Sequence, residues 1–154
     1  MPAYRDKIQL IMQEIGPQTP DIDAVVQHGE DSWALQLDDL SILFIEYAAD
    51  PDRLVLSTEL GMPAPERRLE VCQLMLAYNL LWQENAGLTM ALGGPEGGAT
   101  LLCEWRSTEP ELKKFQEELR RCSQVAQAWR SYIAQTGVAD SSALRALPGL
   151  SSFV

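Results

Sequence analysis

The chain has 154 residues, the size of one domain, and carries 22 Asp and Glu against 12 Lys and Arg, giving a net charge of −10 at pH 7. Such a charge repels nucleic-acid phosphates and anionic lipid headgroups, so neither nucleic acid nor a membrane is expected as a partner. The three cysteines, Cys72, Cys103 and Cys122, are widely spaced and odd in number. They favour buried thiols in a reducing compartment over a disulfide framework.

The N-terminal segment predicts an amphipathic helix that ends at Gly16-Pro17. Its apolar residues recur at helical spacing: Tyr4, Ile8, Ile11, Met12 and Ile15. Charges interrupt this pattern, so the segment is not typical of a secretory signal. The most apolar run, residues 71–82, is shorter than the roughly 17–25 residues that span a bilayer. We therefore expect a cytoplasmic protein.

Three consecutive strands are predicted next, over residues 33–39, 40–47 and 54–60. The first alternates apolar and polar residues, whereas the second is apolar on both faces. In that second strand one face carries Leu43, Ile45 and Tyr47, and the other carries Ile42 and Phe44. Short connections between the strands favour an antiparallel meander.

The second half of the chain predicts a helix, a hairpin and a longer helix. The helix runs from about Glu66 to Glu84 after Pro65, which suits a first helical turn. Strands at 88–92 and 99–106 flank a glycine-rich hairpin tip, and Thr108 and Glu111 form a capping box for the last helix.

The predicted order is α-β-β-β-α-β-β-α, an α+β fold in which three helices pack on a twisted antiparallel sheet. We assign residues 1–137 to one domain and residues 138–154, which are rich in small side chains, to a flexible C-terminal tail.

Motifs for catalysis, metals and cofactors are not found in the sequence. The one histidine, His28, is expected in an exposed loop without a Ser or Cys nucleophile in a known motif. The cysteines lack zinc-site spacing, and the glycine-rich segment 93–98 lacks the Lys-Ser/Thr ending of a phosphate loop. We expect a protein that is not an enzyme and binds no cofactor.

The second helix is the strongest positive signal, because it has two apolar stripes. One stripe contains Leu69, Cys72, Leu76 and Leu80, and we assign Cys72, Leu76 and Leu80 inward. The other stripe is assigned to a partner: Val71, Met75, Tyr78 and Trp82. A helix covered on both sides by its own domain is the alternative, but a small two-layer domain has little protein for this, so we predict a homodimer.

The layout resembles the class I type III secretion chaperones of the Tir-chaperone type over about residues 4–135. The resemblance depends on the order of several apolar motifs: LGMP at 60–63, LMLAYN at 74–79, Gly87 before LTMAL, and LKKFQEEL through AQAW at 112–129. Residues 21–30 and the segment after Gly137 match nothing in this pattern.

The resemblance implies a bacterial, cytoplasmic homodimer that binds the N-terminal segment of a secreted effector in extended form, without ATP, and delivers it to the secretion apparatus. Such binding needs apolar grooves and a sheet edge. The candidate cargo-binding residues are Ile8, Ile11, Met12, Leu43, Ile45 and Tyr47, each of which is also a candidate for the core.

Two alternatives stay open. One is a regulatory adaptor of the same fold that binds a folded partner. The other is a small-molecule-binding or enzymatic α+β domain that uses His28 and nearby carboxylates.

Overall fold

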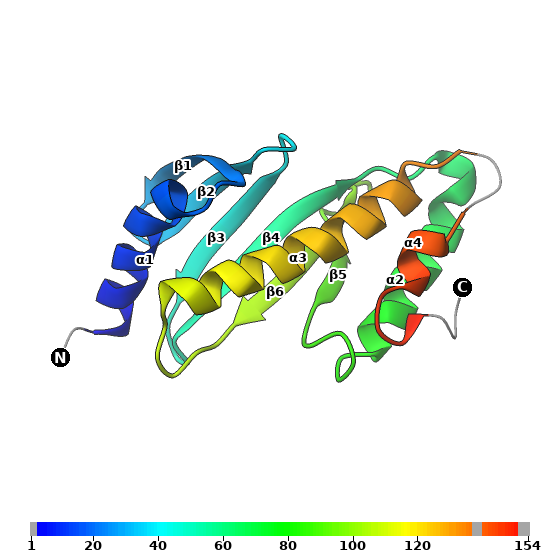
Figure 1. Cartoon of the computed structure of the whole chain (residues 1–154). Helices are drawn as coiled ribbons and strands as arrows, with labels where there is room; N and C mark the ends of the chain where they lie inside the picture. Colours follow the sequence, from blue (N-terminus) through cyan, green and yellow to red (C-terminus); the bar gives the residue numbers. More distant parts are fainter. Residues whose placement is uncertain (1–2, 137–139, 151–154) are drawn as a thin grey trace. The chain divides into compact units, whose positions relative to one another are not determined.

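The computed structural model describes residues 3–136 and 140–150 (Figure 1). The elements follow one another as α1 (Tyr4–Gln18), β1 (Ile22–Gly29), β2 (Ser32–Leu37), β3 (Ile42–Ala48), β4 (Arg53–Gly61), a 3₁₀ turn η1 (Pro65–Arg67), α2 (Arg68–Leu80), β5 (Thr89–Leu92), β6 (Ala99–Trp105), α3 (Leu112–Ile133) and α4 (Ser142–Arg145). The predicted α+β class, with helices packed on an antiparallel sheet, is confirmed. Strand β1 and the short helix α4 were not predicted.

The strands form one sheet in the order β1-β2-β3-β4-β6-β5. The chain divides into two compact units. The first unit contains the N-terminal part up to Thr58 together with Glu104–Arg121. The second contains Glu59–Cys103 together with the part from Cys122 onward. Strands β4 and β6 and helix α3 contribute to both units.

In the first unit, one face of the sheet is buried and forms the core together with helix α1. Alternate residues of β2, β3 and β4 point to this face, as the two-residue period of a strand requires. Those that are fully buried include Trp33, Leu35, Leu43, Ile45, Leu54 and Leu56. Helix α1 adds Ile8, Ile11, Met12 and Ile15, all buried. The Trp105 and Phe115 rings lie 5.1 Å apart between centroids.

Strand β1 lies between the first helix and residue 33, where no strand was predicted. It pairs antiparallel with β2, with irregularities between Ile22 and Ala24 and between Gln27 and Gly29. Only Ile22 of this strand is fully buried, so its sequence lacks the regular alternation that identifies a strand. His28 therefore lies in β1 and is exposed, and the prediction that it lies in a loop is wrong.

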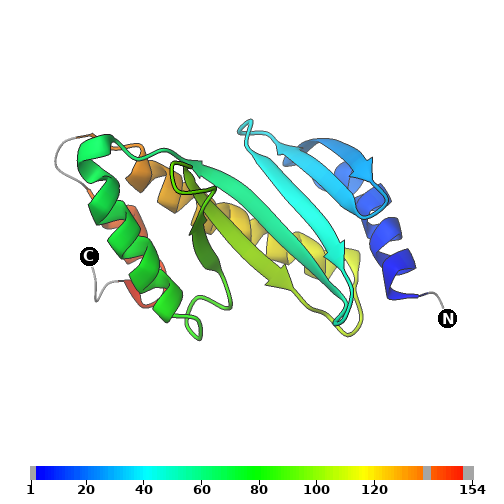
Figure 2. The same cartoon turned by 180° about the vertical axis from the view of Figure 1, so that it is seen from behind.

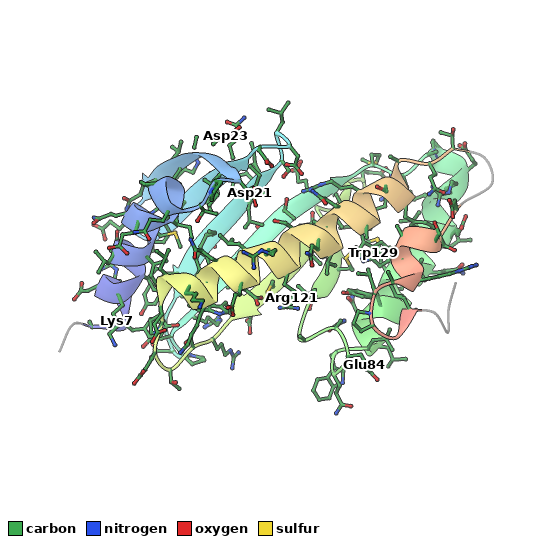
Figure 3. The ribbon with its side chains drawn as sticks, in the orientation of Figure 1. Lys7, Asp21, Asp23, Glu84, Arg121 and Trp129 are labelled. Atoms are coloured by element: carbon green, nitrogen blue, oxygen red, sulfur yellow. The ribbon has the colours of Figure 1, made fainter. Side chains whose placement is uncertain are left out.

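In the second unit, α2 and α3 meet through aromatic side chains. The Tyr78 and Trp129 rings pack edge to face at 5.4 Å, and Trp129 also contacts Tyr132 at 6.1 Å. Trp129, which α3 supplies, is fully buried (Figure 3). Pro65 begins the 3₁₀ turn before α2, as predicted for a first turn.

The predicted β5–β6 hairpin with a glycine-rich tip is present. A Cβ atom on Gly97 would lie 2.5 Å from the Gly93 backbone, so the tip closes only with glycine there. Arg68 donates hydrogen bonds to the Pro95 and Gly97 carbonyls. The loop therefore directs carbonyl oxygens at a cation, Arg68. A phosphate-binding loop instead directs its backbone N–H groups at the anion.

The observed end of α2 and the observed start of α3 differ from the predicted boundaries. Helix α2 ends at Leu80, before the expected Glu84, because buried Asn85 binds the Tyr78 carbonyl and turns the chain. Helix α3 begins at Leu112, so the expected capping box at Thr108 and Glu111 does not start it.

Part of the C-terminal segment is described by the structure. Within residues 140–150, Leu144 and Leu150 are fully buried. Positions 138–139 and 151–154 of the expected tail lie outside the described residues. Among the helices that are described, none is both long and apolar enough to cross a bilayer.

Candidate functional site

Helix α2 buries the stripe that was predicted to face a partner and exposes the stripe that was predicted to face inward. Val71, Met75 and Tyr78, which were assigned to a partner, are 0%, 4% and 1% exposed and belong to the core of the chain itself. Both stripes are apolar, but the larger side chains pack against α3, where Tyr78 meets Trp129. The predicted orientation of the helix is therefore wrong.

The exposed stripe consists of Leu69, Leu76 and Leu80, called the leucine stripe here. These side chains are 72%, 71% and 73% exposed, although Leu76 and Leu80 were expected to be inward. Cys72, on the same face, is half-buried. Trp82, just beyond the helix end, is 65% exposed, and its assignment to a partner interface stays a prediction. These three leucines share one helix face with the exposed Gln73, which lies between Leu69 and Leu76. Together the leucines form an apolar surface that can bind another polypeptide.

The predicted cargo-binding residues lie mainly on the covered face of the first unit. Ile8, Ile11, Met12, Leu43 and Ile45 are all buried. A cargo segment cannot reach most of these side chains, so the choice of sheet face was wrong. Met12 does line a groove, described below, and Tyr47 is half-buried.

The opposite sheet face of the first unit carries exposed apolar residues instead, and Figure 2 views the sheet from this side. Val26, Ile42 and Phe44, called the outer patch here, are 51%, 45% and 41% exposed. The strand register pairs Val26 with Ala34, and Ala34 with Phe44, so the patch is continuous across three strands. This patch is the accessible apolar surface of the sheet in the first unit.

A groove lies between α1 and β1, with a volume of about 420 Å³. Its lining combines apolar and polar residues: Met12, Gln13, Gly16, Pro17, Ile22, Asp23, Ala24 and Val25. The helix and the strand approach closely, because a Cβ atom on Gly16 would lie 3.2 Å from Val25 Cγ2. Strand β1 is an end strand of the sheet, so the groove follows a sheet edge. Asp23 lies along this edge (Figure 3).

Polar contacts connect the start of α1 to the β1–β2 turn, and Tyr47 of β3 to Asp52. Arg5 binds Asp31 at 2.6 Å and Glu30 at 3.1 Å. The Tyr47 hydroxyl donates a hydrogen bond to Asp52, and this bond, with some burial, raises the pKa of Tyr47 to about 12. The Tyr47 ring stacks on Tyr4 at 6.2 Å. Tyr47 is therefore held by its own chain.

The fold and these exposed surfaces define a protein whose accessible features are apolar faces and a sheet-edge groove. The family model described as "Tir chaperone protein (CesT) family" matches residues 18–130, which is most of the chain. The chain belongs to this family, which is that of the type III secretion chaperones. The resemblance stated from the sequence is thus confirmed.

A solved structure described as the crystal structure of the ExsC–ExsE complex is similar in fold. Its TM-score is 0.69 at 14% sequence identity, over 96% of this chain and 98% of that chain. Among curated proteins, none matches the sequence.

Proposed function

We propose that the chain is a homodimeric chaperone that binds the N-terminal segment of a cognate effector in extended form, without ATP, in the bacterial cytoplasm. Binding keeps the effector soluble and competent for delivery to the secretion apparatus. The observation that carries this proposal is the outer patch, because its three large apolar residues are exposed on an ordered sheet. The groove along β1 supports the proposal as a second contact.

An extended segment suits these surfaces better than a compact ligand does. The outer patch lies on a sheet face and the groove follows a strand, so a bound chain can place successive side chains on both. Burying a large apolar side chain contributes up to about 1.5–3 kcal/mol. A flexible ligand loses conformational entropy at each residue that becomes ordered on binding, so many modest contacts are needed to offset this loss. The net charge of −10 favours a cargo segment rich in Lys and Arg.

The leucine stripe is the proposed dimer interface, in place of the stripe predicted from the sequence. Its three side chains are each more than two thirds exposed in the single chain. A twofold partner would cover them with an identical stripe, as isologous contacts require. Homodimerisation also doubles the surface that is open to an extended cargo.

The test uses the full chain co-expressed with the N-terminal segment of the secreted effector encoded beside its gene. We expect the pair to co-purify and the bound segment to be partly protected from protease while staying unfolded. Phe44→Asp should weaken binding at least about tenfold, since a charge replaces one anchor of the outer patch. The readout is the dissociation constant.

Leu40→Asp is the matched control. Leu40 is 73% exposed at the β2–β3 turn, outside the outer patch, so this variant should bind like the wild type. Equal binding by wild type and Phe44→Asp would remove the outer patch from the proposal. Recognition of a folded partner only, with no unfolded segment bound, would favour the regulatory adaptor.

A further inference from the structure

A second hollow lies beside the groove, between the start of α1 and the end of β1. Its volume is about 310 Å³, and its lining is polar: Arg5, Asp6, Gln9, Gln27 and Glu30. We call it the polar hollow. It opens on the same face of α1 as the groove, because the lining residues of the helix follow one another at helical spacing: Arg5, Gln9, Met12 and Gly16. Both hollows belong to the first unit.

Contacts at each hollow show that α1 and β1 run side by side in opposite directions. At the groove, a Cβ atom on Gly16 would lie 3.2 Å from Val25 Cγ2. At the polar hollow, the Gln9 side chain donates a hydrogen bond to the Glu30 carbonyl at 2.6 Å. The groove and the polar hollow therefore follow one another between the same helix and the same strand, so one extended chain can enter both.

The groove suits an apolar side chain. Met12 and Ile22, which line it, are only 3% and 8% exposed. Pro17 and Val25 add further apolar lining. An apolar side chain placed against these residues is removed from water, which favours binding.

The polar hollow suits a cation. Its own cation, Arg5, contacts the carboxylates of Asp31 at 2.6 Å and Glu30 at 3.1 Å. Asp6 adds a third carboxylate, so three negative charges lie around one positive charge. The Glu30 side chain is 90% exposed, so a ligand can reach it. Lys7, the next cation of α1, is two residues from Arg5 and therefore on the opposite helix face.

The charge of the first unit agrees with a basic ligand. This unit contains 16 Asp and Glu against 8 Lys and Arg, whereas the second unit contains 6 against 4. Most of the net charge of −10 thus belongs to the unit that holds the groove and the polar hollow. A basic segment is therefore attracted to the first unit more strongly than to the second.

The distance between the two hollows sets a spacing on the ligand. Along α1, Gly16 and Gln9 are seven residues apart, which is about 10 Å of helix. Along β1, Val25 and Glu30 are five residues apart, which is about 16 Å of extended chain. In an extended ligand, side chains an even number of residues apart point to the same side, and four residues span about 13 Å. A spacing of two is too short, and a spacing of six is too long.

We infer that the cargo segment carries an apolar residue and a Lys or Arg four positions apart. The apolar side chain occupies the groove, and the basic side chain occupies the polar hollow. This inference rests on the proposed function, because it assigns a chemistry and a spacing to the same cargo.

Short fluorescein-labelled peptides test the spacing. Each peptide has a host sequence of Ser and Thr with one Leu and one Arg, which are two, four or six positions apart, in both orders. We expect the full chain to bind the peptides with a spacing of four more tightly than the others by about threefold, as measured by fluorescence polarisation. Equal affinity at all spacings, or no binding of any peptide, would overturn the inference.

The double variant Asp6→Asn/Glu30→Gln tests the polar hollow. It removes two carboxylate charges and should lose the preference for a spacing of four. Asp38→Asn/Glu117→Gln is the matched control, because both residues are exposed in the first unit and lie outside the two hollows. The control removes the same charge and should keep the preference. A preference that persists in the first variant, or is lost in both, would remove the polar hollow from the inference.

The co-expressed effector segment separates this inference from the proposed function. We expect Asp6→Asn/Glu30→Gln to weaken its binding by at least about threefold and the control variant to bind like the wild type. Equal binding by the wild type and Asp6→Asn/Glu30→Gln would overturn the inference and leave the proposed function intact. A segment that does not bind the wild type would overturn the proposed function itself.

Discussion

Arg67 is a buried cation that ties α2 to the end of α3. The residue is 2% exposed, and its Nη1 donates to the carbonyls of Tyr132 at 2.7 Å and Gln135 at 2.9 Å. Its guanidinium also lies 4.6 Å from the centre of the Tyr132 ring. The last carbonyls of a helix lack the usual partners of the helix interior. The Tyr132 carbonyl accepts a long hydrogen bond from the Gln135 N–H at 3.4 Å, and Arg67 adds a shorter, charge-assisted one.

We therefore predict that Arg67→Met lowers the free energy of unfolding by about 2–4 kcal/mol, through lost charge-assisted hydrogen bonds and the lost cation–π contact. Urea titration followed by circular dichroism measures it. Arg120→Met is the control, because Arg120 is exposed on α3 and should change stability by no more than about 0.5 kcal/mol. Equal losses in the two variants would show that burial of Arg67 has no energetic importance.

Because of Tyr47, we predict that the stability of the folded chain depends on pH in the alkaline range. Its hydrogen bond to Asp52 raises its pKa from 10 to about 12 in the folded chain. Below pH 10 the tyrosine is protonated in both states, so its contribution is fully present. Between about pH 10 and 12 the unfolded chain releases this proton and the folded chain keeps it, so stability falls as the pH rises.

We expect the stability difference between wild type and Tyr47→Phe to shrink as the pH rises through this window. Urea unfolding of both proteins at several pH values measures it. Asp52→Asn is the control, since removing the carboxylate should return the phenolate titration of Tyr47 toward its ordinary range. A difference that stays constant with pH would contradict the assigned hydrogen bond.

At the scale of elements, helices and strands with a regular apolar spacing can be predicted from the sequence. Elements without such a spacing cannot, because their structure depends on tertiary contacts. Helix α1 and strands β2 to β6 have regular apolar spacing and were predicted close to their observed bounds. Strand β1 was missed because one buried residue, Ile22, is too little for a period. Helix α4 was missed because its four residues are short for any pattern.

The orientation of α2 could not be obtained from the sequence for a different reason. Its two apolar stripes differ little in hydrophobicity, so the periodicity allows either to face inward. The choice depends on Trp129, more than 40 positions away, whose ring packs against Tyr78. The same limit applies to the cargo surface. The sequence separated Leu43 and Ile45 from Ile42 and Phe44, but only the tertiary structure shows which face is covered.

At the scale of the whole molecule, the two exposed apolar surfaces occur in different units. The outer patch belongs to the first unit and the leucine stripe to the second. A cargo site and a dimer interface built on separate units can be changed one at a time. The net charge of −10 keeps a protein with so much exposed apolar surface in solution.

This separation leads to a prediction on oligomeric state. We expect the wild type to have the mass of a dimer at micromolar concentration and Leu76→Glu to have the mass of a monomer. The variant replaces a side chain that is 71% exposed in the single chain, so the fold should persist while the partner meets an unpaired charge. Sedimentation equilibrium measures the mass.

Leu10→Glu is the matched control, because Leu10 is 55% exposed on α1, outside the leucine stripe, and its variant should stay dimeric. Met75→Glu distinguishes the two stripes of α2. Met75 is 4% exposed, so this change should unfold the chain instead of yielding a folded monomer. A dimeric Leu76→Glu, or a folded monomeric Met75→Glu, would return the interface to the stripe that the sequence predicted. Cargo binding at Phe44 should then be measured in the Leu76→Glu monomer, where one intact outer patch remains on each chain.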